Sequence, residues 1–302
     1  MNRIDVEFES AGTRCAAWLF LPEVEAGQGA DSGPPPIVVM AHGFGAQREM
    51  RLPDFAKRFA SRGLAALVFD YRCFGDSDGE PRNLIDPRRH LEDWRAAIEH
   101  VRASPRLDAG RLALWGTSFS GGHVLAIGSE VAGISAIVSQ IPFVGFDPKG
   151  TSMPLGKMVR AVFSGLRDLA RAARGASPYY VPIAGPPEEF AFLNTPDAMG
   201  YLQDLVPPDS TWQNRAPARV LFQMPRYRPL RDAARIEAPV LMVAAEDDSL
   251  IPIAGVTAAS EKIPGCELVI LPGTGHFEPY TGEVFERVVE REAEFLCKHL
   301  LG

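Results

Sequence analysis

Hydrophobic and polar positions alternate with two different periodicities along this chain of 302 residues, one typical of strands and one typical of helices. Two stretches with a period of two, residues 4–10 and 13–22, are separated by Ala11-Gly12 and predict an antiparallel hairpin. Helical periodicity follows at residues 52–62 and 87–104. Short apolar runs of the kind that form buried parallel strands lie at residues 37–41, 64–69, 111–115, 134–141, 240–244 and 268–271. This alternation predicts an α/β fold with a mostly parallel, doubly wound sheet.

The alternation stops at Pro142 and resumes at residue 238. A long insertion between two strands of a sheet is typically functional. We therefore predict a core made of residues 1–142 and 238–302, with residues 143–237 inserted as a helical cap over the C-terminal edge of the sheet, where such sheets place their sites. A basic amphipathic segment at residues 156–174 has two interpretations. Its mixed charges and lack of tryptophan favour a solvated cap helix over a membrane-facing one.

The composition is that of a globular protein, with 46% hydrophobic and 23% charged residues. A formal net charge of −7 disfavours nucleic acid and anionic membranes as partners. The N-terminal stretch lacks an apolar signal core, and no apolar run approaches a membrane span, so we expect a cytoplasmic protein. The four cysteines are far apart and predict reduced thiols, although a disulfide stays open. The oligomeric state cannot be inferred from the sequence.

A candidate nucleophile follows the apolar run at residues 111–115. The chain there reads Gly116-Thr117-Ser118-Phe119-Ser120-Gly121, and a helical segment at residues 123–130 comes next. A sharp strand-to-helix turn with small residues around a serine can hold the hydroxyl exposed in a strained conformation. The helix N-terminus supplies N–H groups where an oxyanion would form. Taken alone, the stretch also fits an ordinary strand-to-helix turn.

A serine hydroxyl is a weak nucleophile and needs a base that a carboxylate orients. Three acidic residues, Glu246, Asp247 and Asp248, follow the run at residues 240–244. His276 follows the run at residues 268–271 on a glycine-rich loop, and its alternative interpretation is a surface histidine. The order Ser, Asp, His is the order that nucleophile-elbow hydrolases use. The sequence therefore predicts that the three groups meet past the C-terminal ends of parallel strands.

Together these stretches resemble an α/β-hydrolase-fold serine hydrolase. The resemblance covers residues 4–142 and 238–301 and extends to a branch with esterase, dienelactone-hydrolase-like, prolyl-peptidase-like and polyketide-transferase-like members. The motifs that carry it are His42-Gly43-Phe44-Gly45, Asp70-Tyr71-Arg72-Cys73-Phe74-Gly75-Asp76-Ser77, Ser118 in its turn, Asp248-Ser249-Leu250-Ile251-Pro252 and Gly273-Thr274-Gly275-His276. Two positions depart from the family pattern, because Cys73 and Ser120 stand where glycine is usual.

The resemblance implies a catalytic triad of Ser118, Asp248 and His276. The D-x-x-x-P register of the family selects Asp248 rather than Asp247 as the acid. The backbone N–H groups of Phe44 and Phe119 would form the oxyanion hole. Substrate-binding residues are not assigned.

The remaining histidines are expected to be structural or solvated. His42 would hold its loop, and His123 would lie in the core or behind the site. His90, His100 and His299 lie on helical segments and are expected to be solvated. No cluster of His, Asp and Glu has metal-ligand spacing, and no Gly-x-Gly-x-x-Gly opens a helix after the first strand. We therefore expect no metal and no cofactor.

The predicted function is a serine hydrolase, most simply a carboxylesterase, that cleaves an ester, thioester or lactone of a hydrophobic small molecule through an acyl-enzyme. Two alternatives stay open: an acyltransferase with the same triad, and a ligand-binding receptor that has kept the fold. The serine at the turn excludes dehalogenase and epoxide-hydrolase chemistry, which needs a carboxylate there.

Overall fold

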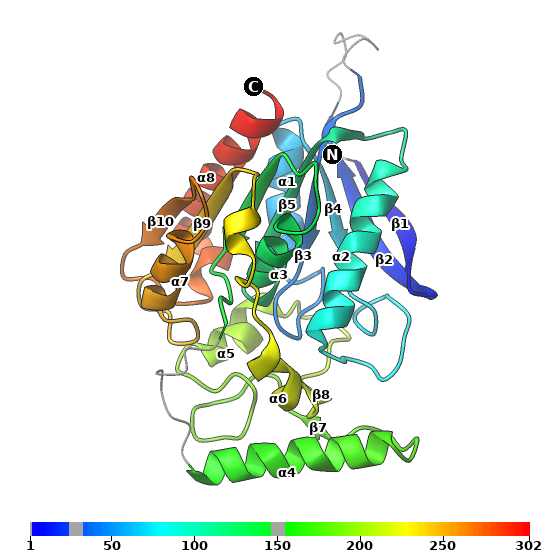
Figure 1. Cartoon of the computed structure of the whole chain (residues 1–302), viewed down its shortest axis with the longest axis vertical. Coiled ribbons are helices and arrows are strands. Elements are labelled where there is room, and N and C mark those ends of the chain that lie inside the picture. Colours follow the sequence, from blue (N-terminus) through cyan, green and yellow to red (C-terminus); the bar gives the residue numbers. More distant parts are fainter. Residues whose placement is uncertain (1, 24–32, 146–154) are drawn as a thin grey trace.

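The computed structural model describes residues 2–23, 33–145 and 155–302. In this part of the chain, eight strands form one sheet in the order β1-β2-β4-β3-β5-β6-β9-β10 (Figure 1). The antiparallel hairpin is confirmed, and the strands from β4 to β10 run parallel to one another. The strands are β1 (Asn2–Ser10), β2 (Thr13–Leu21), β3 (Pro36–Ala41), β4 (Ala65–Phe69), β5 (Asp108–Thr117), β6 (Ala136–Gln140), β9 (Val240–Ala245) and β10 (Glu267–Leu271).

Each apolar run that predicts a strand forms one. Strands β3, β4, β6 and β9 are buried along their whole length, because helices cover both faces of the sheet. Helices α1 (Leu52–Ser61) and α8 (Gly282–Leu300) lie on one face, and α2 (Pro87–Arg102) and α3 (Phe119–Gly128) lie on the other (Figure 1). Helix α7 (Ile253–Ser260) packs beside β9 and β10.

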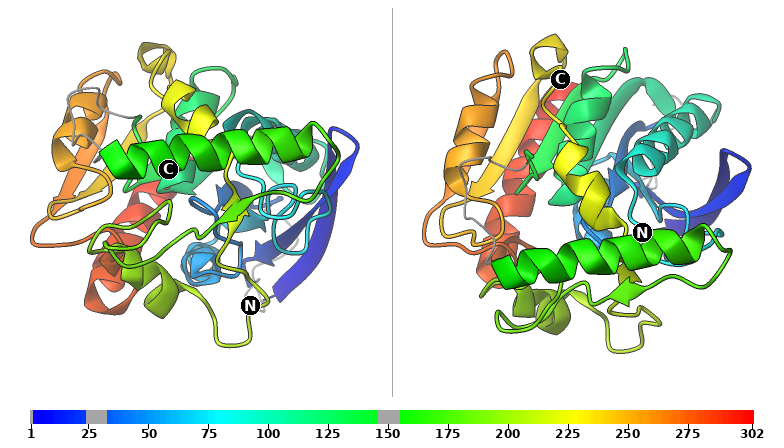
Figure 2. Two further views of the ribbon diagram at one scale, coloured as in Figure 1. Left: turned by 90° about the horizontal axis from the view of Figure 1, so that it is seen from below. Right: turned by 60° about the horizontal axis from the view of Figure 1, so that its bottom comes forward.

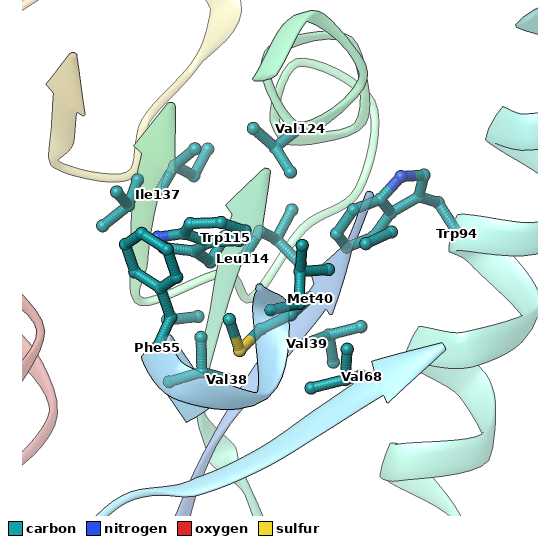
Figure 3. Close-up of a cluster of buried hydrophobic side chains, with 14 of the residues drawn as sticks. Val38, Val39, Met40, Phe55, Val68, Trp94, Leu114, Trp115, Val124 and Ile137 are labelled. Atoms are coloured by element: carbon teal, nitrogen blue, oxygen red, sulfur yellow. The ribbon is translucent and has the colours of Figure 1, made fainter. Parts of the chain in front are cut away.

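The core forms where side chains of alternating strand positions meet these helices (Figure 3). Trp115 of β5 packs on Phe55 of α1, with ring centroids 4.9 Å apart. On the other helical layer, Trp94 of α2 packs edge-on against Phe69 of β4 at 5.2 Å. The central strand β3 contributes Val38, Val39 and Met40, all fully buried. Burial of large aromatic side chains is the main source of stability in such a layer.

The segment between β6 and β9 lies beyond one end of the sheet, and α4 (Leu155–Ala172) runs across it (Figures 1 and 2). The other described elements of this segment are short: β7 (Tyr180–Val181), α5 (Ala198–Gly200), a π-helical turn (Tyr201–Leu205), β8 (Ala216–Pro217), α6 (Val220–Gln223) and two 3-10 turns (Met224–Arg226 and Ala233–Arg235). Strands β7 and β8 pair antiparallel. The predicted fold class is confirmed, whereas the division of the chain at residues 142 and 238 stays a prediction.

Two local predictions change. The helix after the serine begins at Phe119, four residues earlier than expected, because the turn itself needs only one residue. His90, His100 and His299 were expected to be solvated, but His90 is fully buried between α2 and α3, and His100 and His299 are half-buried. All four cysteines carry free thiols, as expected. Within the described ranges, no helix combines the length and the apolar character that crossing a membrane requires.

Candidate active site

Ser118 is the single residue between strand β5 and helix α3. Its backbone has φ 55° and ψ −117°, a conformation that side-chain-bearing residues rarely adopt and that stores strain. Strand and helix pass so close here that a Cβ at Gly116 would lie 2.3 Å from the carbonyl oxygen of Ser120. Glycine at position 116 is therefore required for the turn. The predicted sharp elbow is present.

The two family glycines that this chain lacks are replaced without disturbing the elbow. Ser120 is buried, and its hydroxyl forms a 2.8 Å hydrogen bond with the hydroxyl of Tyr71. Cys73 adopts a positive φ of 73°, the backbone conformation for which glycine is usual. The fold therefore accommodates a side chain at both positions.

His276 and Asp248 complete a hydrogen-bonded line that ends at Ser118. The Ser118 Oγ lies 3.1 Å from His276 Nε2, and His276 Nδ1 lies 2.6 Å from Asp248 Oδ2. A carboxylate only accepts hydrogen bonds, so Nδ1 carries the proton and Nε2 faces the serine as an acceptor. His276 and Asp248 are both buried. The structure therefore brings together the three side chains that the sequence selected.

The choice among the three adjacent acidic residues follows from the turn after β9. Asp248 Oδ1 accepts the backbone N–H groups of Leu250 and Ile251 at 2.8 and 2.7 Å, which aims Oδ2 at the histidine. Asp247 is exposed to solvent. Glu246 points back to the loop after β10 and accepts the N–H of Gly273. Of the three, Asp248 alone contacts His276.

Phe44 and Phe119, whose backbone N–H groups were predicted to form the oxyanion hole, both line the same cavity as Ser118. Phe119 is the first residue of α3, where an N–H has no acceptor within the helix. The N–H of Phe44 lies in the loop after β3 and has no hydrogen-bond acceptor in the described part of the chain. The two phenyl rings are in contact, with centroids 5.6 Å apart. Two unengaged donors at one serine are the arrangement that an oxyanion hole needs.

Ser118 and His276 open into a cavity of about 560 Å³ between the sheet and the inserted segment. The core contributes mostly apolar walls, among them Phe44, Met50, Leu52, Phe119, Leu250 and Ile251. The inserted segment contributes Met158, Ala161, Val162, Phe192, Leu193, Leu221 and Phe222. No Asp, Glu, Lys or Arg of the described residues lines the cavity. It therefore fits an uncharged, largely apolar group.

The loop after β4 holds the neighbouring loop after β3 in place through Asp70. Asp70 is buried and accepts the N–H of Arg48 at 2.7 Å, with the Arg48 guanidinium 3.4 Å away. Burial raises the pKa of Asp70 to about 6, although Arg48 opposes the shift. His42 lies against this pair, and burial lowers its pKa to about 3, so it stays neutral. A neutral His42 fits the predicted structural role.

A buried polar chain behind the elbow escaped the sequence interpretation. His90 Nδ1 lies 3.2 Å from His123 Nε2, and His123 Nδ1 lies 2.7 Å from the hydroxyl of Tyr227. Burial lowers the pKa of His123 to about 3 and that of His90 well below its usual range. Tyr227 belongs to the inserted segment and also packs on the ring of Phe119. In the sequence, the only indication of this buried polar chain was the position of His123 in the helix after the serine.

No group of three or more His, Cys, Asp and Glu residues with the geometry to hold a metal ion occurs among the described residues. Ser118 and His276 line the cavity, and Asp248 lies behind the histidine. The chemistry that this line offers is that of a serine hydroxyl hydrogen-bonded to a buried histidine.

The sheet order, the strained serine and the Ser–His–Asp line define an α/β-hydrolase-fold protein. The chain belongs to the alpha/beta hydrolase family, which matches residues 38–291. It is similar to the quorum-quenching protein AidA of Acinetobacter baumannii (strain MDR-ZJ06), with 42% identity over 296 residues, 97% of this chain and 94% of AidA. The predicted family is thereby confirmed.

Two further similarities extend over the whole chain. Polyketide transferase af380 of Aspergillus fumigatus is 29% identical over 322 residues, which cover 99% of both chains. The crystal structure of the alpha/beta hydrolase GrgF from Penicillium sp. sh18 superimposes with a TM-score of 0.85 at 26% identity and covers 100% of both chains. The inserted segment is thus included in the similarity.

Proposed function

We propose that this chain is a serine hydrolase that cleaves a carboxylic ester, thioester or lactone of a hydrophobic small molecule. The observation that carries the proposal is the hydrogen-bonded line from Ser118 through His276 to Asp248, which begins at the floor of an apolar cavity. A buried base beside a strained, cavity-facing hydroxyl is the arrangement that activates serine for acyl transfer.

In the proposed reaction, His276 Nε2 takes the proton of Ser118 as Oγ attacks the substrate carbonyl. Asp248 holds the ring with Nδ1–H directed at its carboxylate and stabilises the imidazolium that forms. The bond between the carbonyl carbon and the leaving group breaks, and His276 passes its proton to that group. A water molecule then gives a proton to His276 and attacks the acyl carbon. The bond between that carbon and Ser118 Oγ breaks, Oγ takes the proton back from His276, and the acid is released.

The backbone N–H groups of Phe44 and Phe119 would stabilise the negative oxygen of both tetrahedral intermediates. Removal of one such donor typically costs about 3 kcal/mol of transition-state stabilisation. Main-chain donors do not depend on the side chain, so the two phenyl rings serve to line the cavity. They also keep water away from the developing charge.

The cavity supports an uncharged acyl or aryl group as the part of the substrate that binds beside Ser118. Its volume of about 560 Å³ lies in the usual range for small-molecule sites. Phe44, Phe119 and Phe192 surround the space near the serine, and their rings pack edge to face. A charged acyl chain would lose hydration here without gaining a partner.

Acyl transfer to an alcohol or amine is the second candidate. The similarity to a polyketide transferase over 99% of both chains supports it, and the triad would serve it equally well. In that reaction an acceptor hydroxyl or amine replaces water in the second half. The proposed cytoplasmic location is supported by the free thiols of all four cysteines. We propose no nucleic-acid or membrane partner, because the net charge of −7 disfavours both.

A substrate panel tests this proposal. Purified protein is assayed on p-nitrophenyl esters of increasing acyl length, acyl thioesters and lactones, with Ser118→Ala in parallel. We expect turnover by the native chain with an optimum at an apolar acyl group, and loss of turnover in Ser118→Ala. An added alcohol that diverts product from acid to ester supports the transferase. Binding of ligands with no turnover of any panel member would favour the receptor.

A further inference from the structure

Helix α4 is fixed to the rest of the protein along one narrow stripe. Ala161, Ser164, Gly165 and Asp168 are the buried residues of this helix. A Cβ at Gly165 would lie 2.5 Å from the ring of Phe222, so the two segments are in close contact. Asp168 accepts two hydrogen bonds from the Arg219 guanidinium, at 2.6 and 3.0 Å. The helix is therefore firmly held, and its rotation about its own axis is set.

A second face of α4 carries large apolar side chains that are exposed. Its members are 44–70% exposed: Leu155, Met158, Val159, Val162, Phe163, Leu166 and Leu169. Figure 2 shows α4 along the outer edge of the inserted segment, with one side turned away from the sheet. Contiguous apolar surface of this kind marks a site of association. Helix α4 was predicted to be solvated, and the structure exposes its apolar face to water. Exposure of this apolar surface costs free energy.

The exposed apolar residues follow a heptad spacing. Leu155, Val159, Val162, Leu166 and Leu169 are separated by four, three, four and three residues. These five residues form a straight apolar row along the helix, which we call the seam. The side chains of a second helix can fit between the side chains of the seam as knobs into holes. At 1.5 Å per residue the seam is about 21 Å long. The occupant that such a seam fits is another α-helix.

The charges of α4 distinguish a protein partner from a lipid surface. Its basic side chains turn to their own chain: Lys157 donates to the carbonyl of Pro187, Arg160 lies over Phe190, Arg167 lies over Tyr179 and Arg171 donates to the carbonyl of Ser177. A helix that binds an anionic membrane presents such cations beside its apolar face. Here the apolar face has no charged member, so it matches an equally uncharged apolar helix.

We propose that two copies of this chain associate by packing α4 against α4. The seam is nearly symmetric about Val162, with Leu155 and Leu169 seven residues to either side. An antiparallel pair with its two-fold axis at Val162 sets Leu155 against Leu169 of the second copy, which gives the self-complementary contact of a two-fold dimer. Met158 and Val162 also line the cavity, so the second copy lies beside the active site.

Sedimentation and light scattering of the 302-residue chain between about 1 and 100 µM test this proposal. We expect a dimer, twice the 32.9 kDa of one chain. Val159→Glu with Leu166→Glu places uncompensated charge in the seam and should weaken association by at least about 100-fold. Ile270→Glu is the matched control, because Ile270 is 44% exposed on β10 and outside the seam. That variant should remain a dimer.

A cross-link tests the geometry with a small, uncharged substitution at the centre of the seam. Val162→Cys should form an intermolecular disulfide on mild oxidation, whereas the native chain, with its own four cysteines, should not. A native chain that is monomeric at every concentration overturns the proposal. So does a glutamate variant that folds, by circular dichroism, and stays dimeric. Flotation of monomeric native chain with phosphatidylglycerol vesicles also overturns it, in favour of a lipid surface. These outcomes do not depend on esterase activity.

Discussion

Gly43 lies so close to Ser118 that a side chain at position 43 would crowd the serine. A Cβ at position 43 would lie 3.0 Å from the Cβ of Ser118 and 3.5 Å from its Oγ. The next residue is Phe44, whose N–H faces the same serine in the proposed oxyanion hole. The closeness of these two loops therefore sets the distance between the nucleophile and one of the donors that would stabilise the intermediate.

We expect Gly43→Ala to lower kcat by roughly 10²-fold, because the added methyl must displace either the serine or the Phe44 N–H by several tenths of an ångström. KM should change less, since the apolar cavity is kept. Steady-state kinetics on the best ester of the panel measure both constants. Gly156→Ala is the control, because a Cβ there meets no atom within 4 Å. Unchanged kcat in Gly43→Ala would show that the contact does not position the reacting groups.

Asp248→Asn should lower kcat by at least about 10³-fold. In the variant the amide oxygen would stay on the N–H groups of Leu250 and Ile251, so its NH2 would donate to His276 Nδ1. The histidine proton would then lie on Nε2, where it cannot accept from Ser118, and no carboxylate would stabilise the imidazolium. Asp247→Asn is the matched control, since Asp247 is the neighbouring residue and is exposed. Its kcat should stay within about threefold of the native value. If Asp247→Asn were the more damaged variant, the assignment of the acid would be wrong.

Tyr227→Phe should destabilise the fold by about 1–2 kcal/mol, because it leaves the buried Nδ1 of His123 without its 2.7 Å partner. The free energy of unfolding in urea measures the effect. Tyr179→Phe is the comparison, since its hydroxyl has no hydrogen-bond partner among the described residues, and it should be near neutral. Equal stabilities of the two variants would mean that the polar chain behind the elbow contributes little.

Glu292 of α8 should make stability fall as pH rises. It is fully buried, and its carboxylate accepts the indole N–H of Trp115 at 2.8 Å. Burial raises its pKa from 4.5 to about 8. Between pH 4.5 and about pH 8 the folded chain therefore keeps the Glu292 proton, whereas the unfolded chain has lost it. The stability that Glu292 contributes is complete below pH 4.5 and decreases as the pH rises to about 8. The loss can reach about 5 kcal/mol.

Glu292→Gln removes this titration and keeps an acceptor for Trp115. The unfolding free energy of the variant, relative to the native chain, should rise between pH 5 and pH 9. Asp70 and Asp93 have pKa values raised to about 6, and both remain in each protein, so the difference isolates Glu292. A native chain and a variant with parallel pH profiles would contradict the raised pKa.

The core and the Ser–His–Asp line could be predicted from the sequence because their signals are local. A buried parallel strand needs only a short apolar run, as at Ile37 to Ala41, and these runs fix where the sheet lies. The elbow depends on small residues next to one serine, and the acid and the base follow directly after strands. The register from Asp248 to Pro252 was enough to choose among three adjacent acids.

The inserted segment could not be predicted in the same detail. Its elements after α4 are two to five residues long, so they carry no periodicity, and their positions depend on contacts such as Asp168 with Arg219. His90 was placed in solvent because a helical pattern does not tell which polar residue faces a second helix. Its burial depends on partners that are distant in the sequence. His123 lies 33 residues after His90, and Tyr227 lies 104 residues after His123.

The most direct test of the proposed reaction is covalent labelling together with turnover. The native chain should react with a fluorophosphonate probe at one residue per chain and hydrolyse p-nitrophenyl esters. Ser118→Ala should lose both properties, and His276→Ala should lose turnover, while both variants keep the native circular dichroism spectrum. A folded Ser118→Ala variant that still hydrolyses the esters at the native rate would contradict the assignment of Ser118 as the nucleophile.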